Sequence, residues 1–133
     1  AIEIFSKETG KTVENELIMW SREDDPNIAI SPDGVIGTDE AIEIKCISSA
    51  RHIETLITNK VPDEYRFQCL QYFVVSDTLK TLFLGFYDPR LTVKKFFYLT
   101  IKRADVEEDI KTYLEYQRKM LKEVQEIVSR LSF

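Results

Sequence analysis

With 133 residues, 44% of them hydrophobic and 31% charged, the chain has the length and composition of a single globular domain with one sizeable core. No apolar run approaches the roughly 20 residues that span a bilayer, and residues 1–5 include a glutamate, so the sequence predicts neither a membrane protein nor a secretory signal. The net charge of -5 argues against tight, independent DNA binding, because phosphate binding favours a basic surface, although a net charge hides local patches.

The two cysteines, Cys46 and Cys69, lie within apolar patterns, which is typical of reduced thiols in a cytosolic protein. Two cysteines are too few for a four-cysteine zinc site or iron–sulfur cluster. The sequence therefore predicts a cytoplasmic protein without such a cluster.

The chain begins with the pattern of a helix over residues 1–9, which Gly10 ends. Residues 11–20 carry strand signals, with apolar side chains at alternate positions. Residues 21–27 are polar and are expected to form a turn. Residues 28–30 then begin the strand that leads into the most informative stretch of the sequence.

This stretch places two acids and a lysine within a short distance of one another. Residues 40–47 alternate between apolar and polar positions, which is typical of a half-buried strand, so Glu43 and Lys45 should point to the same face. Asp33 precedes Glu43 by ten residues, too far for contact along one extended strand. Residues 34–39 supply the glycines and polar residues of a turn, and we expect a hairpin that brings the two carboxylates together beside Lys45.

Two carboxylates and a lysine on one strand face suit phosphodiester hydrolysis. Carboxylates are hard oxygen ligands for Mg²⁺ or Mn²⁺, and such an ion lowers the pKa of a bound water and screens charge on a phosphoryl oxygen. A lysine can orient the attacking water or stabilise the transition state. The spacing Glu-x-Lys is nevertheless common on exposed strand faces, so this pattern alone does not establish a nuclease.

Two helices are expected after this strand. Ser49 is placed to cap the first, over residues 49–59, whose N-terminus beside the strand offers amide donors to a phosphate. His52 is the single histidine of the chain, and we expect it at the surface. The second helix is expected to begin at residue 62 or 63 and to run to about residue 76.

One face of the second helix carries a polar residue among apolar ones. Gln68, Gln71 or Tyr72, and Val75 share this face at helical spacing. If Gln68 is buried there, it needs a hydrogen-bonding partner.

The rest of the chain predicts two strands and a long helix. Residues 81–87 read as a strand buried on both sides, residues 88–90 as a turn and residues 96–101 as the next strand. A helix from residue 104 or 105 to about residue 131 has an apolar stripe, which we expect to pack on the sheet and to continue into a subunit contact. The order of elements predicts an α/β domain: a central mixed β-sheet flanked by helices, with a long C-terminal helix.

Four short motifs occur in order along the chain: Ser31-Pro32-Asp33-Gly34, Glu43-Ile44-Lys45-Cys46, Tyr65-Arg66-Phe67-Gln68 and Tyr87-Asp88-Pro89-Arg90. Together they resemble the lambda-type phage exonucleases (the YqaJ-like viral recombinases), a branch of the PD-(D/E)xK nuclease superfamily. The resemblance spans the chain from about Gly10 to the C-terminal helix. It implies a restriction-endonuclease-like core and a single nuclease domain over residues 1–133.

The resemblance also implies roles for individual residues. Asp33, Glu43 and the backbone carbonyl of Ile44 would hold Mg²⁺, for which Mn²⁺ would substitute. Lys45, supported by Gln68, would orient the water that attacks the phosphodiester, so the expected catalytic set is Asp33, Glu43, Lys45 and Gln68. Three further residues are expected to bind DNA phosphates: Arg51, Ser49 and Tyr65.

The implied function is a metal-dependent deoxyribonuclease. The resemblance further implies digestion of double-stranded DNA ends from 5′ to 3′ in phage-type recombination, a ring-shaped homotrimer, a single-strand annealing protein as partner, and the host-cell cytoplasm as location. A structure-specific or nicking endonuclease using the same site is one alternative.

A non-catalytic DNA-binding or assembly module is the other alternative. The family carries a further metal-ligating glutamate on its first helix, and the spacing from Gly10 places that residue upstream of Ala1. Glu3 does not match its position. The sequence is therefore expected to hold only part of this helix, as a fragment, a shortened relative or one piece of a split protein.

Overall fold

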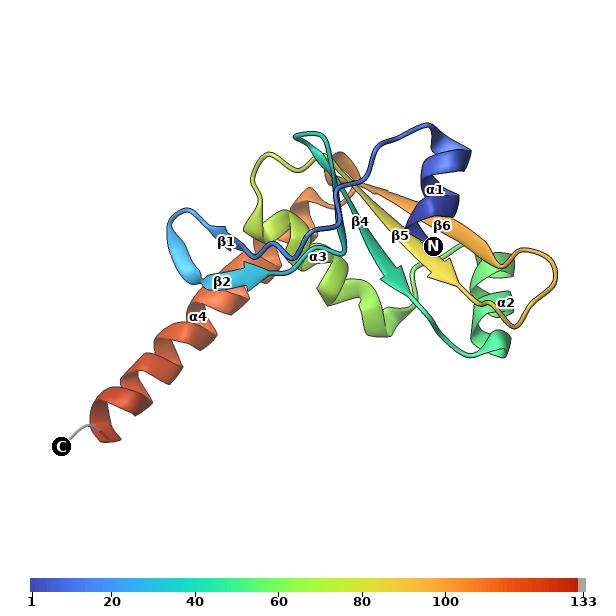
Figure 1. The fold of residues 1–133 in the computed structure, drawn as a ribbon. Coiled ribbons are helices and arrows are strands. Elements are labelled where there is room, and N and C mark those ends of the chain that lie inside the picture. Colours follow the sequence, from blue (N-terminus) through green and yellow to red (C-terminus); the bar gives the residue numbers. More distant parts are fainter. Residues whose placement is uncertain (132–133) are drawn as a thin grey trace.

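The computed structural model describes residues 1–131, which form two sheets with helices around them (Figure 1). The strands are β1 (Trp20–Arg22), β2 (Asp25–Ile30), β3 (Gly34–Ile36), β4 (Glu40–Lys45), β5 (Thr81–Tyr87) and β6 (Phe96–Lys102). The helices are α1 (Ile2–Thr9), α2 (Ser49–Thr58), α3 (Arg66–Val75) and α4 (Glu107–Leu131), with 3-10 turns η1 (Asp63–Tyr65) and η2 (Arg103–Asp105). Within residues 1–131, no helix has both the length and the apolar character that crossing a bilayer demands.

The larger sheet has the strand order β3-β4-β5-β6 and is mixed. The central pair, β4 and β5, is parallel, and the two outer pairings are antiparallel. A parallel pair needs a long crossover connection, which α2 and α3 supply here. Strands β1 and β2 form a separate antiparallel pair. The predicted α/β class is confirmed: a central mixed sheet, flanking helices and a long C-terminal helix.

Strand β4 separates the two halves of the hydrophobic core. Ala41 packs on the side of α3, where Tyr72 is fully buried, whereas Ile42 on the other face packs with Phe5 of α1. Burying one such side chain stabilises the fold by about 2 kcal/mol. The alternation predicted for residues 40–47 is thus confirmed for the strand, but both of its faces are covered, whereas the sequence indicated a half-buried strand.

The predicted hairpin brings Asp33 next to β4. Gly34 pairs with Ile42 across the antiparallel β3–β4 ladder, and Asp33 directly precedes Gly34. A side chain at Gly34 would collide with Val13 and Ile42, because a Cβ atom there would lie 2.4 Å and 2.8 Å from their methyl groups. The glycine therefore permits the close approach of these segments. Gly37 takes a left-handed conformation, with φ 60°, in the turn itself.

Helix α2 differs from the sequence prediction in two respects. Its N-cap is Ser48, whose side chain accepts a hydrogen bond from the Arg51 backbone N–H, and not Ser49. His52 is fully buried rather than on the surface. Its Nε2 atom lies 2.9 Å from the carbonyl oxygen of Lys94, and its ring meets Phe97 edge-on. The β5–β6 connection returns over α2 and covers the histidine.

The strand predicted over residues 11–20 is wrong for most of its length. In the described structure this segment makes one isolated bridge, between Glu14 and Val35, and a strand begins only at Trp20. The alternating pattern fails because β3 is three residues long and offers little edge for pairing. Leu17 and Met19 are exposed as a result. The polar turn predicted over residues 21–27 is shorter than expected, because β2 already begins at Asp25.

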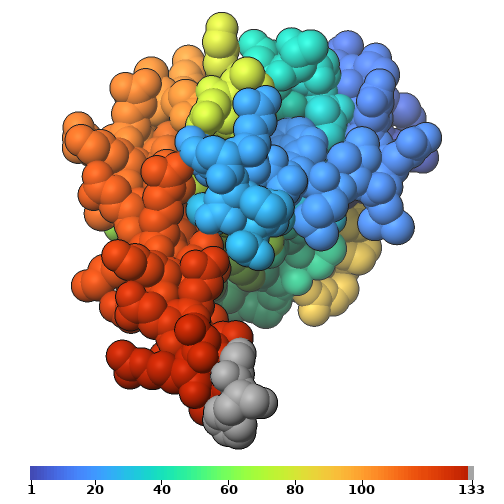
Figure 2. All heavy atoms as spheres, turned by 90° about the vertical axis from the view of Figure 1, so that its left-hand side faces the viewer, coloured from blue at the N-terminus to red at the C-terminus, as the bar shows by residue number. Residues whose placement is uncertain are grey.

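Helix α4 packs chiefly on α3 and not on the sheet as predicted. Ile110 is buried in the core, and Gln117 donates a hydrogen bond of 2.7 Å from its Nε2 atom to Oε1 of Gln71. Beyond this contact the C-terminal half of α4 extends away from the rest of the molecule (Figures 1 and 2). The predicted subunit contact stays a prediction.

Candidate active site

The candidate site lies between β4 and α3, where the polar face of the strand meets the helix. Glu43 is the central group and is 5% exposed. Gln68 donates from Nε2 to Oε1 of Glu43 at 3.1 Å, and the Tyr72 hydroxyl donates a short hydrogen bond to Oε2. Gln68 and Tyr72 are four residues apart on α3 and therefore lie on one face of the helix. Both oxygens of the carboxylate are thus held by α3.

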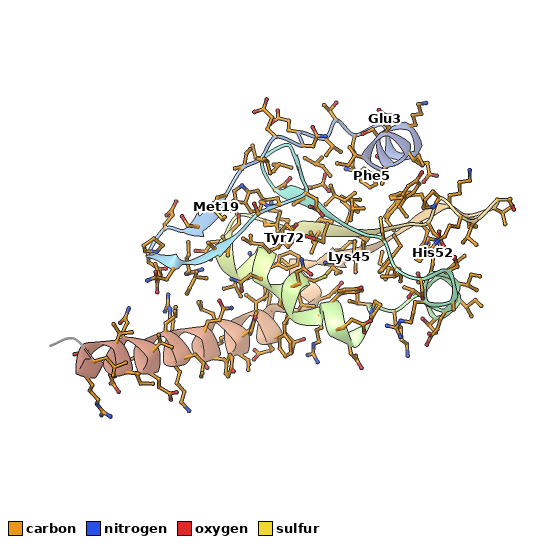
Figure 3. All side chains as sticks on the ribbon, turned by 60° about the horizontal axis from the view of Figure 1, so that its bottom comes forward. Glu3, Phe5, Met19, Lys45, His52 and Tyr72 are labelled. Atoms are coloured by element: carbon orange, nitrogen blue, oxygen red, sulfur yellow. The ribbon has the colours of Figure 1, made fainter. Side chains whose placement is uncertain are left out.

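Lys45 is the third polar group on this face. Its Nζ atom lies 3.7 Å from Oε1 of Glu43 and 4.8 Å from the centre of the Tyr65 ring. Figure 3 shows Lys45 and Tyr72 near one another between the strand and the helix. The ring of Tyr65 stabilises the ammonium group through a cation–π contact. Two hydrogen bonds thus fix the Glu43 carboxylate, whereas Lys45 is held by a longer ionic contact and by the Tyr65 ring.

Asp33 joins the site from the β3 side of the hairpin. Its Oδ2 atom accepts a hydrogen bond of 2.8 Å from the backbone N–H of Ile44. The backbone N–H of Asp33 donates to the Tyr72 hydroxyl at 3.4 Å. Tyr72 thereby connects the two acids, because it accepts from the Asp33 backbone and donates to Glu43. The structure brings Asp33, Glu43 and Lys45 together as the sequence predicted.

The electrostatics of the site disfavour a negative charge on Glu43. Burial, together with the neighbouring Asp33 carboxylate, raises the pKa of Glu43 to about 7. The hydrogen bond from Tyr72 and the charge of Lys45 act in the opposite direction but do not cancel these effects. A cation bound at this point would stabilise the ionised form.

The oxygen atoms available here suit a hard divalent ion. Asp33 and Ile44 line a hollow of about 520 Å³, together with Ala1, Ile2, Glu3 and Asn15. Among the described residues, no group of three histidine, cysteine, aspartate or glutamate side chains is placed to hold a metal ion. The candidate ligands are therefore two carboxylates and the Ile44 carbonyl. This set fits Mg²⁺, which commonly binds one or two carboxylates and keeps several waters.

The three predicted phosphate ligands have partners within the chain, and one of them, Tyr65, lies beside Lys45. Arg51 pairs with Glu64, and its Nη1 atom lies 3.7 Å from Oε2 of Glu54. The Ser49 hydroxyl donates to Oδ2 of Asp88 at 2.5 Å. Tyr65 contacts Lys45, as described above. Phosphate binding by Arg51, Ser49 and Tyr65 stays a prediction.

Tyr72 is the site residue that the sequence did not single out. The helical spacing offers either Gln71 or Tyr72 on the face of Gln68, and a buried tyrosine hydroxyl usually needs a partner. Its partner is Glu43, the buried acid on the facing strand, and the four-residue spacing between Gln68 and Tyr72 already indicates that both side chains can reach the same group. What was missing was the knowledge that α3 packs against β4.

Comparisons with known proteins identify a matching family and solved structures of similar fold. The family model of the YqaJ-like viral recombinase domain matches residues 1–79. An alkaline exonuclease (LHK-Exo) from Laribacter hongkongensis has a similar crystal structure, with a TM-score of 0.72 and 26% sequence identity over 99% of this chain and 70% of that chain. LHK-Exo in complex with dAMP gives a TM-score of 0.72 and 25% identity over the same shares. A search of curated proteins gives no match.

Proposed function

This chain belongs to the YqaJ-like viral recombinase family, and we propose that it is a divalent-metal-dependent deoxyribonuclease of the PD-(D/E)xK type. The observation that carries the proposal is the convergence of Asp33, Glu43 and Lys45 on one polar face of the sheet. The likeness to an alkaline exonuclease over 99% of this chain supports the same reaction class.

In this proposal Asp33, Glu43 and the Ile44 carbonyl hold Mg²⁺, with Mn²⁺ as a substitute. When bound, the ion supplies an activated water and screens the charge that develops on a phosphoryl oxygen. Gln68 and Tyr72 hold the Glu43 carboxylate in one orientation, because each donates to a different oxygen. Glu43 is thereby positioned as a ligand before any ion arrives.

Lys45 has the freedom that a catalytic group needs. Its distance of 3.7 Å from Glu43 is longer than a hydrogen bond, so the ammonium group can turn toward a substrate without losing a tight contact. There it donates to the attacking water or to a phosphoryl oxygen as negative charge accumulates. The Tyr65 ring limits where the lysine can go. Arg51, Ser49 and Tyr65 complete the proposal as contacts to neighbouring DNA phosphates.

The finer assignment follows the family. We assign the enzyme to 5′-to-3′ digestion of double-stranded ends in phage-type recombination, as a homotrimer acting with a single-strand annealing protein in the host cytoplasm. Family membership supports these points, and the dAMP bound to LHK-Exo is a mononucleotide, the size of product that an exonuclease releases.

The test is cleavage of linear duplex DNA labelled at the 5′ or the 3′ end, with Mg²⁺ or with a chelator. We expect Mg²⁺-dependent release of the 5′ label as mononucleotides, and no cleavage of a covalently closed circle. Asp33→Asn should abolish the reaction, while Glu16→Gln, an exposed change outside the site, should leave it intact. Cutting of the closed circle would assign an endonuclease, and binding of linear DNA without cleavage would assign a non-catalytic module.

A further inference from the structure

The loop between β5 and β6 is basic in a chain whose net charge is -5. We call residues 89–95 the basic loop, because they include Arg90, Lys94 and Lys95 and no acid. Arg90 is held in an ion pair, but Lys94 and Lys95 are exposed. Among the ion pairs of residues 1–131, none involves either lysine. Two neighbouring ammonium groups are therefore available to an anionic partner.

The basic loop lies at the same edge of the sheet as Lys45. Lys45 pairs with Phe86 on the parallel strand β5, and Phe86 pairs with Phe97 on β6, so the three side chains share a face. The pairing continues to Lys95, whose carbonyl accepts a hydrogen bond of 2.7 Å from the Asp88 backbone. This register places the Cα atoms of Lys45 and Lys95 about 12 Å apart. Since phosphates of one DNA strand follow at about 3.4 Å along the helix axis, this distance corresponds to a few nucleotides.

A buried histidine holds the basic loop against α2 (Figure 1). His52 is fully buried, and because the carbonyl oxygen of Lys94 can only accept, the Nε2 atom donates across their 2.9 Å contact. In the described structure the Nδ1 atom of His52 has no hydrogen-bond partner. An unsatisfied buried polar atom is costly, and an apolar side chain would fill this core position without that cost. The hydrogen bond to the loop therefore explains the histidine better than core packing does.

The backbone of Lys94 is the second unusual feature of the loop. Lys94 has a φ of 52°, in the left-handed region that residues with a Cβ atom rarely adopt. Within residues 1–131 the other non-glycine residue there is Asn59, which ends α2 as its C-cap, where this conformation is common. Lys94 caps no helix, and its carbonyl is fixed by His52. Backbone strain that neighbouring contacts maintain in this way is typical of functional positions.

We propose that the basic loop binds the DNA backbone a few nucleotides from the scissile phosphate. Lys94 and Lys95 are the phosphate contacts, and His52 is the positioning residue that holds Lys94. This inference rests on the proposed nuclease function, because the site at Lys45 sets where the DNA lies. Contacts away from the scissile bond bind substrate and transition state equally, so they lower KM and leave kcat unchanged.

The first test measures KM and kcat for cleavage of linear duplex DNA with Mg²⁺ at several salt concentrations. Lys94→Asn removes the charge with a residue that tolerates the left-handed backbone, and Lys95→Gln removes the second charge. Each should raise KM severalfold, leave kcat unchanged and reduce the slope of log KM against log salt by about 0.9. The matched control is Lys80→Gln, an exposed lysine directly before β5 at the opposite edge of the sheet, which should change neither quantity.

The outcomes separate this inference from the function on which it rests. Absence of cleavage by the wild type would overturn both. Cleavage by the wild type, with KM and salt dependence unchanged in Lys94→Asn and Lys95→Gln, would overturn the role of the basic loop alone.

The second test examines His52 as a positioning residue. His52→Leu fills the core without a donor, whereas His52→Gln keeps a donor for the Lys94 carbonyl. His52→Leu should reproduce the KM and salt dependence of Lys94→Asn, and combining the two changes should add nothing. His52→Gln should stay close to the wild type. A fall in kcat, or an equal defect in both His52 variants, would show that the histidine supports the fold and does not position Lys94.

The third test locates the contact on the DNA with duplexes that carry one neutral methylphosphonate linkage. A neutral linkage about two to four nucleotides from the scissile bond should raise KM for release of the first nucleotide by the wild type. The same linkage should have no further effect on the variant whose lysine contacts it. Sedimentation should give every variant the wild-type mass, which excludes altered assembly as the cause. A changed mass, or no coupling at any linkage, would overturn the proposal.

Discussion

Two buried carboxylates, Glu43 and Asp88, sit at 5% and 0% exposure, yet their surroundings shift their acidity in opposite directions. Burial raises the pKa of Glu43 to about 7. Hydrogen bonds from Ser49 and from the Arg90 side chain lower the pKa of Asp88 to about 2. Burial alone therefore does not determine whether an acid is charged; the donors around it do.

The difference lies in the partner cation. The Nε atom of Arg90 donates to Oδ1 of Asp88 at 2.8 Å, and its Nη2 atom also donates to the Ile47 carbonyl, so this pair is fixed and joins the β5–β6 turn to the start of α2. Lys45 stays 3.7 Å from Glu43, and a second acid, Asp33, adds repulsion. Asp88 is stabilised as a structural anion, whereas Glu43 is left with an unsatisfied preference for a cation.

The largest effect is expected from removing Lys45, whose ammonium group is held less tightly than the guanidinium group of Arg90. Lys45→Ala should lower the rate of DNA cleavage at saturating Mg²⁺ by about a thousandfold, because a donor to the developing charge is lost. Mn²⁺ binding should change little. Arg90→Ala should have the reverse profile, with lower stability and near-normal cleavage by the folded fraction. Undiminished cleavage by the Lys45 variant would remove this residue from the mechanism.

The two acids can be compared directly by the same conservative change. Glu43→Gln should weaken Mn²⁺ binding by about a hundredfold, as measured by titration calorimetry, because a charged ligand becomes neutral. Asp88→Asn should bind Mn²⁺ like the wild type but should unfold at a lower temperature, because Arg90 loses its ionic partner. Equal loss of Mn²⁺ binding in both variants would show that the distinction between the two carboxylates is wrong.

The sequence predicted the strand and hairpin of the site because local chemistry determines both. The period of residues 40–47 assigned Glu43 and Lys45 to one face, and the glycines after Asp33 required a turn. The motif Tyr87-Asp88-Pro89-Arg90 is predicted as a turn and contributes to the family resemblance, but the sequence gives Asp88 no partner, since its hydrogen bond with Ser49 joins residues far apart in the chain.

The predictions that were wrong share one physical cause. The pattern of residues 11–20 is that of a strand, but a strand forms only where an edge is available, and β3 is too short to provide one. His52 looked like a surface residue on its helix, but the β5–β6 connection covers it. The packing of one element on another depends on residues far apart in the chain, so a local sequence pattern does not predict it.

The stability of the metal-free protein should depend on pH through the same two acids. The pKa of Glu43 is raised from 4.5 to about 7 on folding, so this carboxyl group stabilises the folded state. The stabilisation is fully present below about pH 4.5 and is lost as the pH rises to about 7. The loss should be about 3 kcal/mol in the free energy of unfolding. The contribution of Asp88 has the opposite sign and is lost as the pH falls from 3.8 to about 2.

Denaturant titrations with a chelator between pH 4.5 and 8 measure this dependence. Glu43→Gln should make the free energy of unfolding nearly independent of pH in this range. Asp88→Asn should keep the pH dependence of the wild type but have a lower free energy of unfolding at every pH. Mg²⁺ should restore stability to the wild type at pH 8 and do little for the Glu43 variant. If both variants showed the same pH dependence of stability, a group other than Glu43 would be responsible for it.

The smallest effect is expected from the residue that connects the two acids of the site. Tyr72→Phe removes the hydrogen bond that lowers the pKa of Glu43, so this pKa should rise further and less of the carboxylate should be ionised near pH 7. The Mg²⁺ concentration needed for half-maximal cleavage should then increase by about tenfold at pH 7 and by less at pH 9, where Glu43 ionises in either protein. Tyr98→Phe, on the opposite face of the sheet beside Phe5, is the matched control. A defect of equal size at both pH values would mean that Tyr72 supports the packing of α3 on β4 and does not set the charge of Glu43.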